Sequence, residues 1–161
     1  MEAFTNAGDQ SYSLYQDLSN RDSLSLYKNF EGDYNYFFKG YKGWDFSFIA
    51  NENPTYTKVF DTIELRTDLY NEKGELKNSC PINFLRISNE YQDSSQITID
   101  AKNMRKKFRI WRGLLPRNKD TRQRIRNPWS MITLGWKPSI TEQADNINKA
   151  IVHDVSVKYT I

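Results

Sequence analysis

The sequence predicts an all-β fold: a mostly antiparallel β-sandwich of about eight strands with little helix. Aromatic residues make up 14% of the 161 residues although apolar residues make up only 38%, and Tyr and Phe favour pleated, half-buried surfaces. Apolar and polar residues alternate at period two in several segments, as in a strand with one buried face. No long helical segment separates these stretches, which favours antiparallel pairing over parallel crossovers.

Five segments alternate clearly and three do so weakly. The clear ones are 44–48, 62–67, 107–110, 132–136 and 151–161, and the weaker ones are 34–38, 84–88 and 96–100. Their apolar members should form the core, because side chains two apart on a strand share a face. The predicted core is Trp44, Phe46, Phe48, Ile63, Leu65, Phe108, Ile110, Ile132, Leu134, Val155 and Val157.

The two ends of the alternating region are less regular. Residues 1–30 carry scattered Ser, Asn and Asp without a period, so we expect an irregular N-terminal arm there and the β-sandwich domain over 31–161. The segment Ser139–Glu142 matches a helix capping box, but the Asn-rich stretch after it is poor helix material. We therefore rank a long hairpin connection above a short helix at 139–148.

Positive charge is concentrated in the segment from Lys102 to Arg126. It holds eleven basic residues against the single acidic residue Asp120, a net charge of +10, so the rest of the chain carries −7. We rank a contact with an acidic patch of a neighbouring subunit first, a solvated surface second, and phosphate contacts with nucleic acid third. The candidate interface residues are Arg109, Arg112, Arg117, Arg122, Arg124, Arg126 and Trp129.

Catalytic, metal and cofactor sites find little support in the sequence. One Cys and one His exclude multi-cysteine and multi-histidine metal sites. His153 lies on the apolar side of its strand, where a packed or hydrogen-bonded histidine is expected. The carboxylates of Asp61, Glu64 and Asp68 could line an ion or carbohydrate site, but acidic residues are ordinary on the solvated face of a strand. We expect no enzyme activity, no metal and no cofactor.

Several segments in order resemble a known family. They are 51–61 (NENPTYTKVFD), 89–92 (NEYQ), 106–112 (KKFRIWR), 115–117 (LPR), 124–129 (RIRNPW) and 153–159 (HDVSVKY). Together they look like the C-terminal region of the large tail structural proteins of crAss-like bacteriophages, the stabilization or muzzle protein family. The resemblance covers about 30–161. The family proteins are much longer, so we expect this chain to be an excised domain, a fragment or a smaller paralogue.

The resemblance implies a role in virion architecture and carries over no enzymatic residue. We therefore expect a domain of a short-tailed phage tail that stabilises the tail through contacts with other tail subunits, oligomeric in the virion and made in the bacterial host cytoplasm. No apolar run is long enough for a membrane segment. The alternative is a carbohydrate-binding or host-adsorption β-sandwich module, a rival that rests on fold analogy alone.

Overall fold

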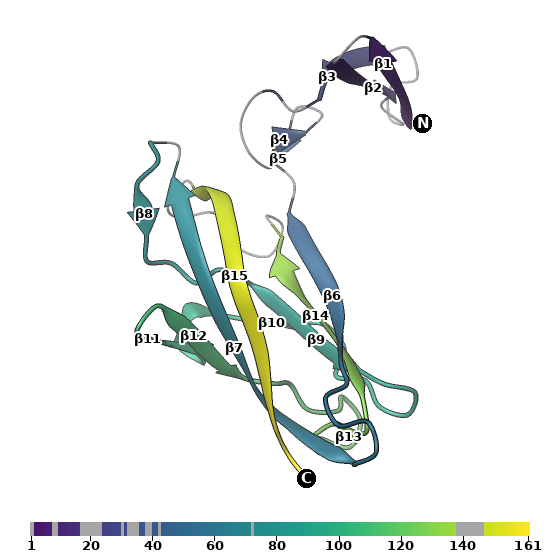
Figure 1. Cartoon of the computed structure of the whole chain (residues 1–161), viewed down its shortest axis with the longest axis vertical. Helices are drawn as coiled ribbons and strands as arrows, with labels where there is room; N and C mark the ends of the chain where they lie inside the picture. Colours follow the sequence, from purple (N-terminus) through teal and green to yellow (C-terminus); the bar gives the residue numbers. More distant parts are fainter. Residues whose placement is uncertain are drawn as a thin grey trace. The chain divides into compact units, whose positions relative to one another are not determined.

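The computed structural model describes residues 2–7, 10–16, 24–29, 31, 36–37, 40–41, 43–71, 73–137 and 147–161. The chain divides into two compact units, Met1–Tyr41 and Lys42–Ile161, and each is described by itself. The described residues form strands and one short 3-10 helix, η1 (Ala101–Asn103), and no α-helix (Figure 1). The predicted all-β class with antiparallel pairing is confirmed.

The first unit contains a three-stranded antiparallel sheet, where we expected an irregular arm over 1–30. Its order is β1-β2-β3, with bounds β1 (Glu2–Ala7), β2 (Gln10–Gln16) and β3 (Leu24–Lys28); β4 (Tyr36–Phe37) and β5 (Gly40–Tyr41) form a separate pair. Polar side chains reinforce the sheet: Ser13 donates to Asn29 Oδ1 (2.7 Å), and Asn29 Nδ2 donates to Ser11 Oγ (3.1 Å). Polar side chains make these contacts, so the alternation of apolar and polar residues did not predict strands in 1–30.

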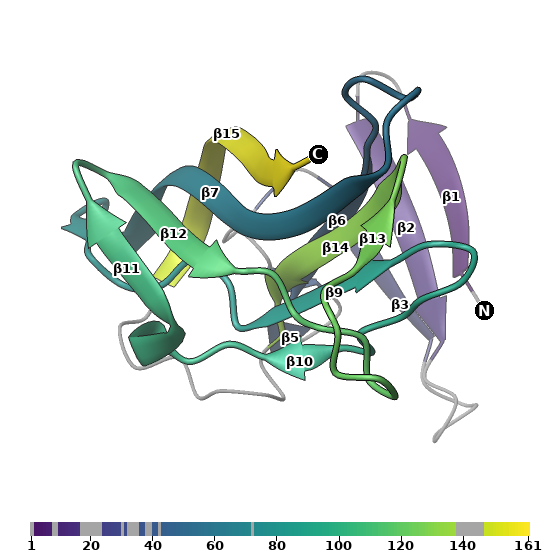
Figure 2. The ribbon, with the colours of Figure 1, turned by 90° about the horizontal axis from the view of Figure 1, so that it is seen from below.

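The second unit is a sandwich of two antiparallel sheets (Figures 1 and 2). One sheet has the order β10-β9-β14-β6, with bounds β6 (Trp44–Ala50), β9 (Phe84–Ser88), β10 (Ile97–Thr98) and β14 (Ser130–Trp136). The other runs β11-β12-β7-β15, with bounds β7 (Lys58–Asn71), β11 (Met104–Lys107), β12 (Ile110–Leu114) and β15 (Ile147–Thr160). Two short strands, β8 (Leu76–Lys77) and β13 (Arg126–Asn127), also pair with β7.

The core lies between the two sheets and is densest under their central strands. Ile63 and Leu65 of β7 and Ile132 and Leu134 of β14 are all 0% exposed, as predicted. The predicted core residues of the outermost strands are half-buried and pack against this cluster: Trp44, Phe46, Phe48, Val155 and Val157. An outermost strand has a neighbour on one side only, so its inward side chains keep part of their surface exposed.

Two predicted core residues are wrong. Phe108 is 86% exposed and Ile110 is 38% exposed, whereas Trp111 is buried. The reason is a tight hairpin: β11 and β12 pair with Lys107 opposite Ile110, so Phe108 and Arg109 form a two-residue turn. The turn reverses the chain in the middle of the apparent alternation, and a one-residue change of phase moves every side chain to the other face.

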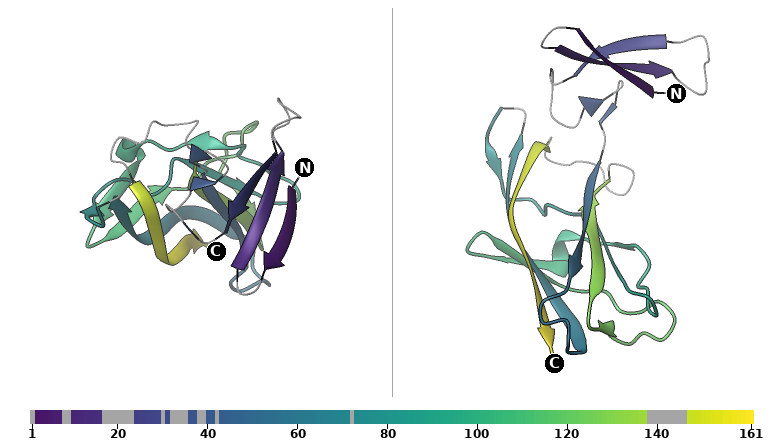
Figure 3. Two further views of the ribbon diagram at one scale, coloured as in Figure 1. Left: turned by 90° about the horizontal axis from the view of Figure 1, so that it is seen from above. Right: turned by 45° about the vertical axis from the view of Figure 1, so that its right-hand side comes forward.

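Strand β15 runs beside β7 over most of its length (Figure 3). Its register shifts between Val152 and Asp154, and His153, at this irregularity, is exposed and hydrogen-bonded to Asp68. The hydrogen-bonded role predicted for this histidine is confirmed, while its place on the buried face is not. The hairpin connection or helix considered at 139–148 lies largely outside the described residues, because 138–146 are not described. Its last two residues belong to β15, which begins at Ile147.

A buried lysine joins two loops at one end of the sandwich. Lys58, at the start of β7, is 0% exposed. Its ammonium donates to the carbonyl oxygens of Asn53 (3.0 Å) and Tyr56 (3.4 Å). It also donates to the carbonyl of Pro128, just before β14. The turn before β7 and the loop before β14 are therefore held by one cation.

Candidate functional site: an arginine-lined pocket

The basic segment separates into two groups of arginines, and the first lies on the outer face of the larger sheet. The register of β12 on β7 places Arg112 opposite Glu64, and the two form an ion pair. At the hairpin turn, Arg109 Nη2 donates to both carboxylate oxygens of Asp68, each at 2.9 Å. Residues directly opposite on antiparallel strands share a face, so the pairing register itself brings these charges together.

Further bonds complete these pairs. His153 Nε2 lies 2.9 Å from Asp68 Oδ2, and Lys158 Nζ lies 3.8 Å from Glu64 Oε2. The hydrogen bond from Arg109, and then that from His153, lower the pKa of Asp68 because they stabilise the charged carboxylate. The carboxylates considered for an ion or carbohydrate site are thus engaged by basic side chains of the same domain.

The second group lines a pocket of about 700 Å³ that is open to solvent. The pocket is formed where the loop after β9 meets the segment between β12 and β13. Three of the seven candidate interface residues come together here, Arg117, Arg124 and Arg126, and the remaining lining residues are Val59, Tyr91, Gln92 and Gln123. Sequence reasoning did not place the loop after β9 at this site, because only the folded sandwich brings the two segments together.

One wall is the loop 89–95, whose turn is fixed by a single asparagine. Asn89 Oδ1 accepts hydrogen bonds from the backbone N–H groups of Tyr91 and Gln92, both at 2.9 Å. The backbone N–H of Asn89 also donates to the carbonyl of Gln92 (2.9 Å). Gln92 Oε1 then accepts from the backbone N–H of Arg126 at 2.7 Å, which ties this wall to β13.

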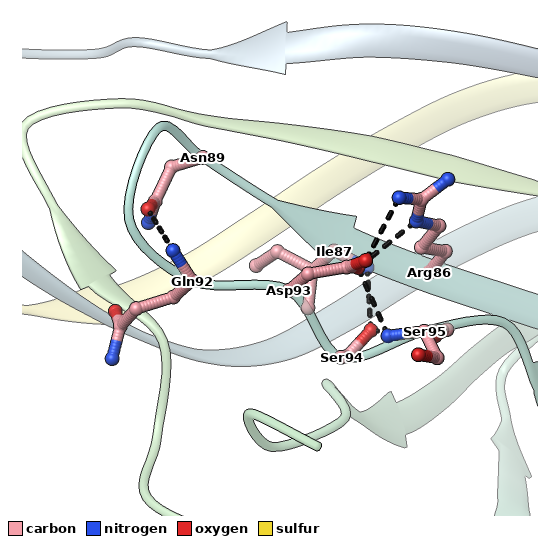
Figure 4. Close-up of polar contacts among 7 residues, drawn as sticks. All are labelled: Arg86, Ile87, Asn89, Gln92, Asp93, Ser94 and Ser95. Atoms are coloured by element: carbon pink, nitrogen blue, oxygen red, sulfur yellow. Dashed lines mark hydrogen bonds and ion pairs between the residues drawn. The ribbon is translucent and has the colours of Figure 1, made fainter. Parts of the chain in front are cut away.

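The same loop is anchored to β9 at its second half (Figure 4). Arg86 donates from Nε and Nη2 to the two carboxylate oxygens of Asp93, at 3.0 and 2.9 Å. This bidentate contact is the main cause of the lowered pKa of Asp93, and the backbone N–H of Ser95 adds a hydrogen bond of 2.9 Å. Ser94 Oγ accepts from the backbone N–H of Ile87 at 3.0 Å. The pocket wall is therefore preorganised.

The other wall is the loop 115–125, which is built around buried Asn118. Its Oδ1 accepts from the backbone N–H groups of Asp120 (2.8 Å) and Thr121 (2.9 Å). The two walls are linked because the backbone N–H of Lys119 donates to the carbonyl of Asp93 at 2.9 Å. Both loops thus hold their shape through hydrogen bonds within the domain.

The charge of the pocket is only partly neutralised from within. Arg124 forms an ion pair with Asp61. Arg117 Nη1 donates to the carbonyl of Arg122 (3.3 Å), and no ion pair with a carboxylate is found for Arg117 or Arg126 among the described residues. Guanidinium groups bind carboxylates through two parallel hydrogen bonds, so the pocket is suited to an oxyanion ligand.

The two remaining candidates flank the pocket without lining it. Arg122 has a φ of 60° and contributes its carbonyl to Arg117, while its side chain is exposed. Trp129 is half-buried in the segment between β13 and β14. The interface role of all seven residues stays a prediction.

The single cysteine and the possible metal ligands are the potentially reactive groups of the described residues. Cys80 donates to the carbonyl of Ile82 (3.3 Å), and burial raises the pKa of its thiol, which disfavours the reactive thiolate. Across 43–71, 73–137 and 147–161, together with the described residues of the first unit, no group of three His, Cys, Asp or Glu side chains is placed to hold a metal ion. The same residues contain no helix long and apolar enough to cross a membrane.

The fold and the pocket define a class: an antiparallel β-sandwich domain with a preorganised, arginine-lined pocket. Comparison with known proteins identifies the family. Residues 32–118 match the family model of the crassvirus muzzle protein C-terminal domain. The muzzle protein of Bacteroides phage crAss001 is 35% identical over 133 residues, which cover 80% of this chain and 10% of that protein. The chain belongs to the crassvirus muzzle protein family, which confirms the resemblance found in the sequence.

Proposed function

We propose that this chain is a structural domain of a phage virion, located in the tail, that stabilises the tail through contacts with neighbouring subunits. The family membership supports a virion role, and the chain spans about a tenth of the length of the curated relative it matches. In this proposal the domain acts by binding and carries out no chemistry. It is made in the bacterial host cytoplasm and becomes part of an oligomeric assembly.

The observation that carries the proposal is the excess of guanidinium groups in a rigid pocket. Arg117 and Arg126 line the same pocket, and Asp61 is already paired with the third pocket arginine, Arg124. Arginine is enriched at protein interfaces because its planar group desolvates more readily than an ammonium group and forms two hydrogen bonds to a carboxylate. The partner in this proposal is an acidic segment of an adjoining tail subunit.

Two alternatives have less support. Nucleic acid binding would use the basic segment as one continuous surface, yet Arg109, Arg112 and Arg124 are each paired with a carboxylate of the domain. A carbohydrate-binding module built on tryptophan platforms has less support, because Trp111 is buried and the other three Trp side chains are half-buried.

The test of the proposal is the assembled virion. The substitutions Arg117→Gln and Arg126→Gln would be introduced together into the phage gene, with Lys73→Gln and Lys102→Gln as a charge-matched pair of exposed basic residues outside the pocket. We expect the pocket variant to give virions that lose tail protein or release DNA on heating, seen by electron microscopy and nuclease sensitivity. The control should behave as the parent.

A titration of the isolated chain separates the acidic partner from DNA. We expect polyglutamate to bind the parent chain and to bind the pocket variant at least about tenfold more weakly. Submicromolar binding of duplex DNA that is lost in the pocket variant would contradict the proposal. For such binding, the logarithm of the binding constant should fall with the logarithm of the salt concentration, at a slope of about −0.9 per phosphate contact.

A further inference from the structure

The tip of the β11–β12 hairpin has an unusual backbone for the residues that form it. Phe108 and Arg109 have φ angles of 49° and 66°, so both central residues of this two-residue turn lie in the left-handed region. Turns with two positive φ values are normally made by Asn, Asp and Gly. A bulky residue in this conformation is strained, and such strain persists only where the surrounding structure holds it.

Several contacts hold the tip in place. Arg109 donates hydrogen bonds to both carboxylate oxygens of Asp68, which is a buried residue. His153 forms a hydrogen bond to the same carboxylate. At the base of the turn, Lys106 donates to Asn78 Oδ1 and lies 5.3 Å from the centre of the Trp111 ring. The turn is therefore anchored on both sides while the aromatic side chain between these anchors points to solvent.

Phe108 is the most exposed of the large hydrophobic side chains described, at 86%, and it continues an apolar stripe. Ile110 and Leu114 lie on the outer face of β12 and are 38% and 68% exposed. The stripe runs from the tip through Ile110 to Leu114 and is interrupted by Arg112, which lies on the same face and pairs with Glu64. Exposed apolar side chains that gather on one face of a domain mark interaction sites.

Basic side chains border this stripe on both sides. Lys107 and Arg66 lie directly opposite Ile110, one on β11 and one on β7, and Arg105 lies opposite Arg112. Lys107 Nζ also lies 5.4 Å from the centre of the Phe108 ring. The described residues offer no ion-pair partner to Arg66, Arg105 or Lys107, so this rim is positively charged.

We infer that the hairpin tip and the outer face of β12 form a second docking surface, separate from the arginine pocket. Its partner is a protein surface with an apolar depression that takes Phe108 and with carboxylates around it that meet Arg66, Arg105 and Lys107. This inference goes beyond the proposed function, because it assigns a different surface and a different mode of contact.

A protein partner fits this surface better than phosphate or an anionic membrane does. Asp68, Glu64 and Asp154 lie on the same outer face, on β7 and β15, and would repel a continuous array of phosphates. A protein surface, by contrast, can carry carboxylates only at the positions that face Arg66, Arg105 and Lys107. Aromatic side chains that insert into a pocket of the partner are typical hot-spot residues of protein interfaces.

The experiment titrates labelled peptides into the full chain and follows fluorescence anisotropy. The first probe is a synthetic acidic peptide with Leu and Phe among Glu residues. The second has Ser in place of Leu and Phe, and the third has Lys in place of Glu. The test variant is Phe108→Asn, since Asn suits a turn residue with positive φ and should raise the melting temperature. The matched control is Tyr56→Asn, another exposed aromatic residue, which lies outside both surfaces.

In a chain with Arg117→Gln and Arg126→Gln, which removes acidic-peptide binding at the pocket, we expect the first peptide to bind best. Adding Phe108→Asn should weaken it about tenfold or more, with little change on adding Tyr56→Asn. A rise in melting temperature together with this loss would separate binding from folding. Equal binding with and without Phe108→Asn in that chain would overturn the inference. Tighter Phe108-dependent binding of duplex DNA or phosphatidylglycerol vesicles than of the first peptide would also overturn it. The variant with Arg117→Gln and Arg126→Gln should still bind the first peptide. A failure of the pocket proposal can therefore be told apart from a failure of this inference.

Discussion

The paired arginines on the outer sheet face and the arginines of the pocket come from one basic segment but differ in their surroundings. Arg109 and Arg112 face Asp68 and Glu64 because the strand register places carboxylates of β7 beside them. Arg117 and Arg124 extend from the loop between β12 and β13. Arg126 lies on β13 opposite Val59 of β7, so the register brings no carboxylate beside it, and it has no ion-pair partner among the described residues.

This difference teaches that local charge does not by itself identify a binding surface. A sheet face can carry several arginines that serve only its own architecture, because acidic residues on the neighbouring strand neutralise them. Loops that are rigid for other reasons, such as the Asn89 and Asn118 turns, can hold arginines apart from any carboxylate. Positive charge that the domain leaves unneutralised is therefore the more informative signal of a partner.

The largest expected effect tests the frame below the paired arginines. Leu65 lies on β7 between Glu64 and Arg66 and is fully buried, so Leu65→Ala should lower the free energy of unfolding by about 2–5 kcal/mol. Val59→Ala, at the half-buried wall of the pocket, should cost about 1 kcal/mol. Urea denaturation measures both values. Equal losses of unfolding free energy in the two variants would show that the wall of the pocket contributes as much to stability as the core below the paired arginines.

A smaller effect separates the two groups of arginines directly. Arg112→Gln removes the ion pair with Glu64 and should lower stability by about 0.5–1 kcal/mol, as for other solvent-exposed pairs. Arg126→Gln should leave stability within about 0.5 kcal/mol because its side chain has no ion-pair partner in the described residues. Binding of polyglutamate should show the opposite order. If Arg112→Gln weakened binding more, the paired face would be the functional one.

The smallest effect appears in acid. The pKa values of Asp68 and Asp93 are lowered in the folded chain by arginine partners, so their contribution is complete above the unfolded value of about 3.9. It is lost as the pH falls below that value and through the lower folded pKa. Asp93→Asn should make the melting temperature less dependent on pH below about 4. A curve unchanged from the parent would show that the Arg86 contact does not stabilise the loop.

The sequence predicted well where strands are long and pair regularly. Ile132 and Leu134 alternate within β14, which has a partner strand on each side, so burial follows the period. The hairpin at Phe108 could not be predicted, because a two-residue turn of Phe and Arg carries none of the usual turn residues. The pocket could not be predicted as a whole either. Arg117 and Arg126 were candidates, but Gln92 joins them only through the packing of two loops.

The lysine at the start of β7 has a consequence for how the domain responds to its medium. In many loop sites, converging carbonyl oxygens are organised by a bound metal ion, and their order then depends on the concentration of that ion. Here the Lys58 ammonium occupies the place where the carbonyls of Asn53, Tyr56 and Pro128 converge. The cation is covalently attached and 0% exposed, so dilution and chelating agents cannot remove it. These two loops should therefore keep their order in chelating buffers.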